Sequence, residues 1–403
     1  MRDSENKHGI NRVLYHHRTQ GKAVEGVHIR GVVDALRAMG TSVDIISLPG
    51  ADPYATPAAM SPTRQATPFM RFVAKLPQPV FELAEFAYNL VAAFRVSSYV
   101  GRHRDIDFIY ERYSLFMFAP LLIAKLRGVP MLLEVNDSAT VERVRPVFFL
   151  FLARAIERWV FRNATGLVVV SQTFLDYLER AHGRMAPAIV TPNAANLADF
   201  SFTPAQRDNV RMRYGLTDSV VCGYLGAFVP WHAIDKFVYA IASRLDATPH
   251  LKLLLVGDGA TFASVAEFVT ARRLDHQIVL TGRVPHAEVP GLLAAMDMAI
   301  LPSAGDYTSP VKLFEFMACG IAPVAPDLAP IKEVLREGET GWMFPAYDMD
   351  AAVRSVMEHA GDPQQLRTVG GAARSYVGAE RQWANNIEQL LRFHRELISG
   401  RDG

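Results

Sequence analysis

Short runs of apolar and β-branched residues alternate with amphipathic helical stretches along the chain. In the first half, the helical stretches have apolar residues at three- and four-residue spacing, whereas the runs between them are short and apolar throughout. This alternation is typical of parallel βαβ units, in which both faces of the sheet are covered by helices. The predicted strands are 13–16, 42–48, 108–110, 131–135, 167–170 and 188–191, and the helices include 27–38, 79–101, 115–126 and 147–162.

A second series of the same kind begins near residue 220. The stretches VVCGYLG and LKLLLVGDG each read as a buried strand that ends in a glycine turn. Because the polar segment 201–213 separates the two series, we predict two doubly wound, Rossmann-like domains at 1–205 and 206–380. Ligands are expected in a cleft at the carboxyl ends of the strands. Residues 381–403 are predicted to form a helix that packs back on the first domain. The other predicted elements are the strands 277–281, 298–301 and 322–325, the helices 233–245, 261–272 and 330–337, and a helix near Ser309.

Composition narrows the class of protein. Half of the 403 residues are hydrophobic, and 42 basic against 41 acidic side chains leave a net charge of +1. Such a balance supports globular cores and gives no overall field that would attract nucleic acid. Cys222 and Cys319 are too few for a disulfide framework, which favours a cytoplasmic protein. No signal peptide or membrane-spanning stretch is recognisable in the sequence.

The common nucleotide-binding fingerprints are absent from the sequence. Neither series carries GxGxxG at its first glycine turn, and no GxxxxGK[ST] loop occurs. A phosphate site would therefore have to be built from other groups.

The segment SAGDYTSPVKLFEFMACG at 303–320 offers such groups. Ser309 followed by Pro310 predicts a helix start, with the serine as cap and the proline in the first helical position. A helix N-terminus attracts anions, and Lys312 adds a positive charge in the first turn. Glu315 could accept two hydrogen bonds from a diol such as a ribose. A structural cap with a solvated glutamate explains these residues alone equally well.

Several motifs together resemble one family. SPVKLFEFMACG, LLLVGDG and TGRVPHAEV in the second half, with GKAVEGVHIRGVVDAL, IYERYS, GVPMLLEVND and VVVSQTFLDYL in the first, resemble the retaining GT-B glycosyltransferases of group 1. The resemblance implies a nucleotide-diphosphate sugar as donor, with Glu315 at its ribose and the backbone of Ser309, Pro310 and Val311 at its phosphates. The donor-side residues so implied are Gly226, His232, Gly257, Arg283, Tyr307, Ser309, Pro310, Val311, Lys312 and Glu315.

Two positions depart from the family pattern. Tyr307 stands where a second glutamate is common, and GAFVPWHAIDK carries His232 and Ala233 where a lysine and a glycine are common. Both departures bear on the sugar that the donor site accepts.

Polar residues at strand ends in the first half predict the acceptor side. The catalytic candidates are Glu111 and Asn136, which follow buried strands, and His28, which lies in the first turn of the first long helix. The alternatives are that Glu111 and Arg112 form a structural ion pair with each other and that His28 only packs. His16 and His17 are predicted to point to opposite faces, one into the core and one toward the ligand. The remaining acceptor-side candidates are Glu25, Gly26, Arg112 and Asp137.

Two further features have competing interpretations. Asp105-Ile106-Asp107 matches a metal-binding DxD, but it precedes a strand, so we assign it to chance and expect no metal or other cofactor. Residues 69–104 combine arginines with phenylalanines. We predict a helix whose apolar stripe, Leu83, Phe86, Leu90 and Phe94 among its members, packs on the domain; peripheral contact with the inner face of a membrane is the alternative.

The function expected from the resemblance is transfer of a hexosyl group to an acceptor hydroxyl with retention of configuration. Family membership implies cell-surface polysaccharide or glycolipid synthesis and a saccharide or lipid-linked saccharide acceptor. The alternatives are a catalytically silent GT-B scaffold or a nucleotide-sugar epimerase.

Overall fold

The structure is a computed structural model that describes residues 9–21, 24–54, 77–141, 146–285 and 288–400. The chain forms two compact units, unit 1 from residues 1–192 and 384–403 and unit 2 from residues 193–383. The sequence pattern predicts the change of domain at 205–206, whereas the units divide at 192–193. The difference arises because Ala195 and Phe200, around the short helix η2 (Leu197–Phe200), pack into the core of unit 2.

Unit 1 is built on a six-stranded parallel sheet in the order β2-β1-β3-β4-β5-β6. The strand order reverses between β1 and β3, which makes the carboxyl ends of these two strands the topological switch point. The strands are β1 (Arg12–His16), β2 (Ser42–Ile46), β3 (Phe108–Arg112), β4 (Met131–Val135), β5 (Gly166–Val169) and β6 (Ala188–Val190).

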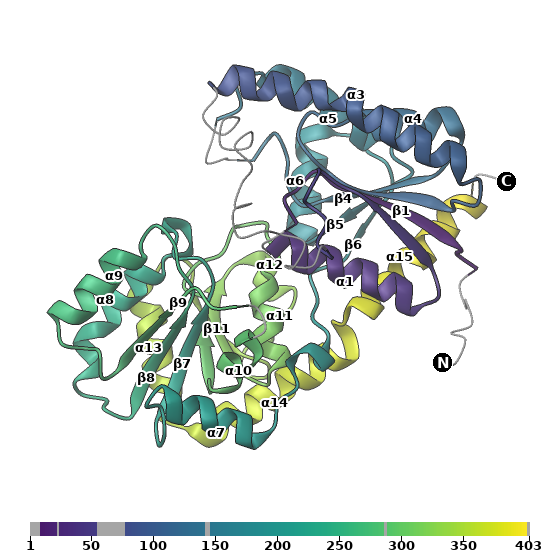
Figure 1. Cartoon of the computed structure of the whole chain (residues 1–403). Helices are drawn as coiled ribbons and strands as arrows, with labels where there is room; N and C mark the ends of the chain where they lie inside the picture. Colours follow the sequence, from purple (N-terminus) through teal and green to yellow (C-terminus); the bar gives the residue numbers. More distant parts are fainter. Residues whose placement is uncertain (1–8, 22–23, 55–76, 142–145, 286–287, 401–403) are drawn as a thin grey trace. The chain divides into compact units, whose positions relative to one another are not determined.

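Helices cover both faces of this sheet (Figure 1). The carboxy-terminal helix packs on unit 1, since Asn386 donates to the Pro192 carbonyl at 2.7 Å and the His394 ring lies 4.7 Å from that of Phe108. The helices are α1 (Val24–Ala38), α3 (Gln78–Arg102), α4 (Ala119–Arg127), α5 (Leu150–Asn163), α6 (Gln172–His182) and α15 (Trp383–Ser399).

Unit 2 contains the second six-stranded parallel sheet, in the order β12-β11-β10-β7-β8-β9. Counted along the unit, this is the 3-2-1-4-5-6 order of the dinucleotide-binding folds, and its switch point lies between β7 and β10. The strands are β7 (Val220–Leu225), β8 (Leu251–Val256), β9 (Ile278–Gly282), β10 (Met298–Ile300), β11 (Ala322–Asp327) and β12 (Trp342–Pro345).

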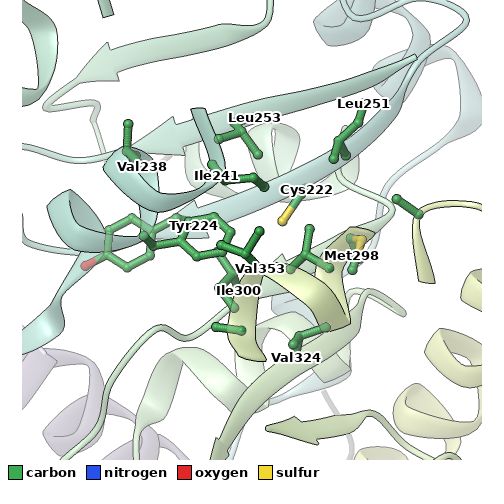
Figure 2. Packing of buried hydrophobic residues seen from close by; sticks show 14 of the residues in the cluster. Cys222, Tyr224, Val238, Ile241, Leu251, Leu253, Met298, Ile300, Val324 and Val353 are labelled. Atoms are coloured by element: carbon green, nitrogen blue, oxygen red, sulfur yellow. The ribbon is translucent and has the colours of Figure 1, made fainter. Parts of the chain in front are cut away.

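Alternate residues of these strands face two different hydrophobic cores. Cys222 and Tyr224 of β7 belong to one cluster with α8, α9 and α13, whereas Val221 belongs to the other with α10, α11 and α12. Figure 2 shows Tyr224 at the margin of the first cluster, with its hydroxyl pointing away from the apolar side chains. The helices of unit 2 are α7 (Pro204–Arg213), α8 (Ile234–Leu245), α9 (Phe262–Ala271), α10 (Val289–Ala294), α11 (Val311–Ala318), α12 (Ala329–Lys332), α13 (Met349–His359) and α14 (Pro363–Glu380).

The predicted class of fold is confirmed, and the largest differences lie at element ends. The helix predicted at 115–126 begins only at Ala119, and the one predicted at 330–337 is the short α12. Strand β12 was not predicted, because the apolar run at Trp342–Pro345 has only four residues and ends in a proline. Helices α13 and α14 were not predicted either.

Gly257, which follows β8, occupies a position that only glycine can fill without strain. Its φ is +135°, and a Cβ atom there would lie 1.9 Å from the Gly226 carbonyl oxygen. The two glycines thus bring the turn after β8 against the turn after β7.

We therefore expect Gly257→Ala to lower the free energy of unfolding by roughly 2 kcal/mol or more, measured by urea unfolding. Gly371→Ala is the matched control, because that glycine lies inside α14 with no atom within 4 Å of an added Cβ. It should leave stability unchanged or raise it by up to about 1 kcal/mol. Equal losses in both variants would contradict the close approach of the two turns.

Candidate functional site

The turns at the switch point of unit 2 surround a buried amine. Lys312 lies in the first turn of α11, the helix that follows β10, and its Nζ is buried without a hydrogen-bond partner among the described residues. That Nζ lies 5.0 Å from the centre of the Tyr224 ring. It also lies close to Gly226, where an added Cβ would come within 2.8 Å. Among the described residues no carboxylate lies within hydrogen-bond distance of this amine, although buried charges are normally paired.

Burial perturbs the two ionisable groups of α11 in opposite directions. It lowers the pKa of Lys312 to about 8, against a smaller opposing effect of Glu315. It raises the pKa of Glu315 to about 7, and the charge of Lys312 opposes that rise. Perturbed pKa values of this kind are common at functional sites. An anion bound beside Lys312 would restore the favourable environment that the ammonium lost on burial.

His232 and Tyr224 hold the loop after β7. The Tyr224 hydroxyl donates to the Ala227 carbonyl at 2.8 Å, and His232 Nδ1 lies 2.8 Å from the same oxygen and 3.2 Å from the hydroxyl. Burial and the charge of Lys312 lower the pKa of His232 to about 4. The imidazole is therefore neutral at pH 7, and its proton is best placed on Nδ1, facing the carbonyl. It therefore adds no positive charge beside Lys312.

The start of α11 differs from the prediction. The helix begins at Val311 with Pro310 as its N-cap, and no side chain in the described ranges caps it. The Ser309 hydroxyl instead accepts from the backbone N–H of Asn193 at 3.0 Å, and the Ser309 carbonyl accepts from the Asn193 amide. Because the Ser309 hydroxyl is hydrogen-bonded to Asn193, it does not cap α11. The first backbone N–H groups of the helix, beside Lys312, therefore have no serine cap.

The other predicted donor-side residues lie on loops at the same edge of the sheet. Arg283 follows β9 and is exposed, and Tyr307 lies half-buried in the loop between β10 and α11. Next to Tyr307, Asp306 accepts from the Tyr347 hydroxyl. In the turn after β8, the Asp258 side chain accepts from the N–H of Gly259 at 2.7 Å, a hydrogen bond within the turn itself.

In unit 1, strand register places polar residues side by side at the switch point. His16 of β1 and Glu111 of β3 are register partners, with His16 Nδ1 2.6 Å from the carboxylate. Arg112 of β3 and Glu134 of β4 are register partners too, and they form an ion pair. The alternative that Glu111 and Arg112 pair with each other is therefore wrong, because neighbours along a strand point to opposite faces.

Glu134 is the centre of this group, and it was not predicted. One of its oxygens pairs with Arg112 and accepts from the Asn136 amide; the other lies 3.0 Å from His28 Nε2 and 3.4 Å from the Tyr15 hydroxyl. Burial acts to raise its pKa, but the charges of His28 and Arg112 and the hydrogen bonds outweigh it and hold the pKa at about 2. The signal was present in GVPMLLEVND, where one acid interrupts a buried strand.

The remaining predicted residues of unit 1 are placed as follows. His28 is buried against Glu134, and both His16 and His17 are fully buried, so the prediction that one of them lines a ligand site is wrong. Gly26 is tightly packed, because an added Cβ would lie 2.3 Å from the Gly21 carbonyl. Glu25 is half-buried, and Asp137 accepts from the N–H of Ser138 at 2.8 Å.

Both acids of the Asp105–Asp107 motif bind the start of β1. Asp107 accepts from the backbone N–H of Asn11 at 2.6 Å and of Arg12 at 3.0 Å, while Asp105 pairs with the Arg12 side chain at 2.9 Å. Within the part of the chain that the structure describes, no three His, Cys, Asp or Glu side chains gather as a metal site would require. In the same residues, no helix has both the length and the apolar character needed to cross a membrane.

Comparison with known families gives a match in each unit. The family model described as "Glycosyl transferases group 1" matches residues 219–362, and the one described as "Glycosyl transferase 4-like domain" matches residues 25–194. Together the two matches span most of both sheets.

Individual relatives are distant but extensive. The alpha-D-kanosaminyltransferase of Streptomyces kanamyceticus is 23% identical over 70% of this chain and 74% of its own length. A GDP-mannose-dependent alpha-(1-6)-phosphatidylinositol monomannoside mannosyltransferase of Mycolicibacterium smegmatis is 26% identical over 77% of this chain and 80% of its own.

Solved structures share the fold. Sucrose-phosphate synthase from Thermosynechococcus elongatus has a TM-score of 0.73 at 19% identity, covering 97% of this chain and 100% of the other. Anabaena HepE in complex with UDP has a TM-score of 0.67 at 15% identity, covering 95% and 100%. These likenesses establish the two-domain GT-B architecture.

Proposed function

Because this chain belongs to the glycosyl transferases group 1 family and is a glycosyltransferase of GT-B type, we propose that it moves a hexosyl group from a nucleotide-diphosphate sugar to an acceptor hydroxyl, with retention of configuration and without a metal. The observation that carries the proposal is the buried amine of Lys312 at the switch point of unit 2, which has no hydrogen-bond partner among the described residues. Solved structures of Anabaena HepE, which share the fold, were obtained with UDP and with UDP-glucose.

In this proposal unit 2 holds the leaving group. Negative charge develops on the nucleoside diphosphate as the sugar–phosphate bond breaks, so fixed positive groups lower the barrier. Lys312 supplies a full charge, and the uncapped start of α11 supplies backbone N–H groups and the positive end of the helix dipole. Glu315, one turn further along α11, accepts hydrogen bonds from the ribose hydroxyls. The neutral His232 offers Nε2 as an acceptor and fixes the loop through Nδ1.

Unit 1 supplies the acceptor side of the proposal. His28, Arg112 and Asn136 share one carboxylate, Glu134, so the three side chains are held in fixed positions by a single buried group. Groups that are positioned in this way lose little freedom when they bind a substrate hydroxyl. We assign Glu134 as a positioning residue and propose a saccharide or lipid-linked saccharide of the cell surface as acceptor.

Glu315→Ala should weaken binding of the donor nucleotide by roughly 10- to 100-fold, because hydrogen bonds to a carboxylate contribute about 1.5–3 kcal/mol. The measurement is the dissociation constant by calorimetry, with Glu358→Ala, an exposed acid of α13, as the control. Normal nucleotide binding in Glu315→Ala would refute the ribose assignment.

The pKa of Glu315 adds a test that does not involve ligand. Burial raises this pKa to about 7 from an ordinary value near 4.5, so the folded protein holds its proton more tightly than the unfolded chain does. The stability that the protonated Glu315 contributes is fully present below pH 4.5 and is lost as the pH rises to 7. Glu315→Gln should therefore lose less stability than the wild type between pH 4.5 and 7.

Product analysis tests the reaction itself. The enzyme would be incubated with UDP-, GDP- and ADP-sugars and simple saccharide acceptors, and the new glycosidic bond followed by NMR in the presence of a chelator. An α-configured donor that yields an α-linked product supports retention without a metal. A β-linked product, or activity abolished by the chelator, would overturn that part of the proposal. Interconversion of sugars without an acceptor would favour the epimerase, and absence of any binding would favour the silent scaffold.

A further inference from the structure

Unit 1 exposes large apolar side chains on three helices at one face of its sheet. Leu90 and Phe94 of α3 are 77% and 74% exposed, and Phe151 of α5 is 89% exposed. Isolated exposed apolar residues are common, but a gathering of this size marks an interaction surface. We call it the α3–α5 surface; its apolar members are Leu83, Phe86, Leu90, Val91, Phe94, Leu122, Leu126, Phe151 and Leu152, with Phe148 just before α5.

The orientation of α3 is the reverse of the predicted one. The apolar stripe of the helix faces outward, and the buried face carries two polar residues, Glu82 and Asn89, besides Ala92 and two valines. The prediction fails because polar groups fix the helix. Glu82 accepts from the backbone N–H groups of Phe148 and Phe149 at 2.7 and 2.8 Å, just before α5 begins.

Asn89 fixes α3 at a second point. Its side-chain oxygen accepts from the backbone N–H groups of Phe118 and Ala119, both at 2.9 Å, where α4 starts. Helix starts have free N–H groups that need acceptors, and Glu82 and Asn89 meet that need from inside. The apolar stripe of α3 is therefore held toward the outside by hydrogen bonds that would have to break before the helix could turn.

The three helices form one continuous layer. Figure 1 shows α3, α4 and α5 on the same face of the sheet. Near the carboxyl ends of the helices, Arg127 of α4 donates to Ser97 of α3 at 3.4 Å, and Lys125 of α4 donates to Asn163 of α5 at 2.6 Å. Together with the contacts of Glu82 and Asn89, these bonds connect the helices at both ends.

In this layer the acidic side chains lie inside and the exposed charged side chains are basic. The acids of α3, α4 and α5 turn inward: Glu82 and Glu157 are buried, and Glu85 pairs with Arg18 at 2.8 Å. Every exposed charged side chain of these helices is basic, although the chain as a whole has a net charge of only +1. These basic residues are Arg102, Lys125, Arg127, Arg154, Arg158 and Arg162.

We propose that the α3–α5 surface docks on an anionic lipid bilayer, with its apolar side chains in the interface and its basic side chains at the lipid headgroups. Outward leucine and phenylalanine side chains with surrounding Lys and Arg are the combination that binds such interfaces. Each basic residue near an anionic surface contributes about 1 kcal/mol. The alternative of membrane contact through residues 69–104 is thus extended to α3 together with α4 and α5. Residues 69–76 lie outside the described residues.

The proposal concerns unit 1 alone and does not depend on the donor or the reaction. Its test is flotation of the full chain with vesicles of phosphatidylcholine, with and without phosphatidylglycerol. The protein should float with the phosphatidylglycerol vesicles at low salt and be released at high salt. Nucleotide binding, measured on the same preparations, reports separately on unit 2.

Two pairs of variants separate the apolar from the electrostatic contribution. Leu90→Glu with Phe94→Glu, and Arg154→Glu with Arg158→Glu, should each weaken vesicle binding by roughly tenfold or more. Met212→Glu and Arg367→Glu, at exposed positions of α7 and α14 in unit 2, are the controls and should bind like the wild type. All substituted side chains are exposed, so the fold should be preserved.

Three outcomes would overturn the proposal. The first is no flotation with either kind of vesicle. The second is equal flotation of the surface variants and the controls. The third is a dimer in solution that Leu90→Glu with Phe94→Glu converts to a monomer, without vesicle binding in either form, which would make the surface an interface between two copies.

Discussion

Lys312→Met is expected to weaken donor binding by roughly 10- to 100-fold while raising the stability of the protein. The ammonium is buried without a hydrogen-bond partner in the described part of unit 2, so its removal abolishes a desolvation cost of about 1–3 kcal/mol. In the proposed function its charge is also the main attraction for a diphosphate at the start of α11. Calorimetric titration with nucleoside diphosphates and urea unfolding measure the two effects.

The opposite signs distinguish a binding residue from a structural one. A lysine that only supported the fold would leave a less stable protein when replaced. Lys332→Met is the control, because that lysine is largely exposed and its ion pair with Asp327 lies at the surface. Unchanged nucleotide affinity in Lys312→Met would contradict the donor assignment, whatever the change in stability.

Stability as a function of pH gives an independent reading of Lys312. Burial lowers its pKa to about 8 from about 10.5, so between these values the folded protein holds fewer protons than the unfolded chain. The free energy of unfolding should therefore gain from Lys312 as the pH rises from 8 to 10.5, and Lys312→Met should lack that gain.

Glu134→Ala is expected to destabilise the protein by about 3–5 kcal/mol, because it leaves the Arg112 guanidinium buried without its ion-pair partner. His28 and Asn136 lose their shared partner as well. Urea unfolding measures the loss. Glu179→Ala, at an exposed position of α6, is the control and should change stability by less than about 0.5 kcal/mol.

Glu134→Gln keeps the shape of the side chain and tests its charge. In the wild type the pKa of Glu134 is held at about 2, below its ordinary value near 4.5. The stability that this carboxylate contributes is present above pH 4.5 and is lost as the pH falls to 2, so Glu134→Gln should show a smaller acid loss. Identical acid unfolding of the two proteins would contradict the central place of Glu134. A positioning role further requires that transfer activity fall in the folded variant.

The sequence was sufficient for the fold class because each sheet strand is a short apolar run between amphipathic helices. Both six-stranded sheets and nearly all of their strands follow from that pattern. The orientation of α3 could not be predicted from the sequence, since the apolar stripe of a helix normally packs inward. Only the hydrogen bonds of Glu82 and Asn89 to the starts of α5 and α4 reverse it. Contacts between residues so distant along the chain leave no periodic signal.

The sequence predicted more of the candidate site in unit 2 than in unit 1. Lys312 and Glu315 follow from the helix start and the family motif, yet the role of Ser309 could not be foreseen, because its partner Asn193 is remote in sequence. In unit 1, Glu111 and Arg112 were recognised as polar strand ends. Their pairing with His16 and Glu134 depends on the register between neighbouring strands, which cannot be read from the sequence.

Binding of nucleoside diphosphates tests the central claim most directly. The wild-type protein and Lys312→Met would be titrated with UDP, GDP and ADP in a thermal-shift assay without added metal. A ligand that binds only the folded state raises the melting temperature by mass action. We predict that one of the three nucleotides raises the melting temperature of the wild type and that the shift shrinks sharply in Lys312→Met. No shift with any of them at millimolar concentration would contradict this claim.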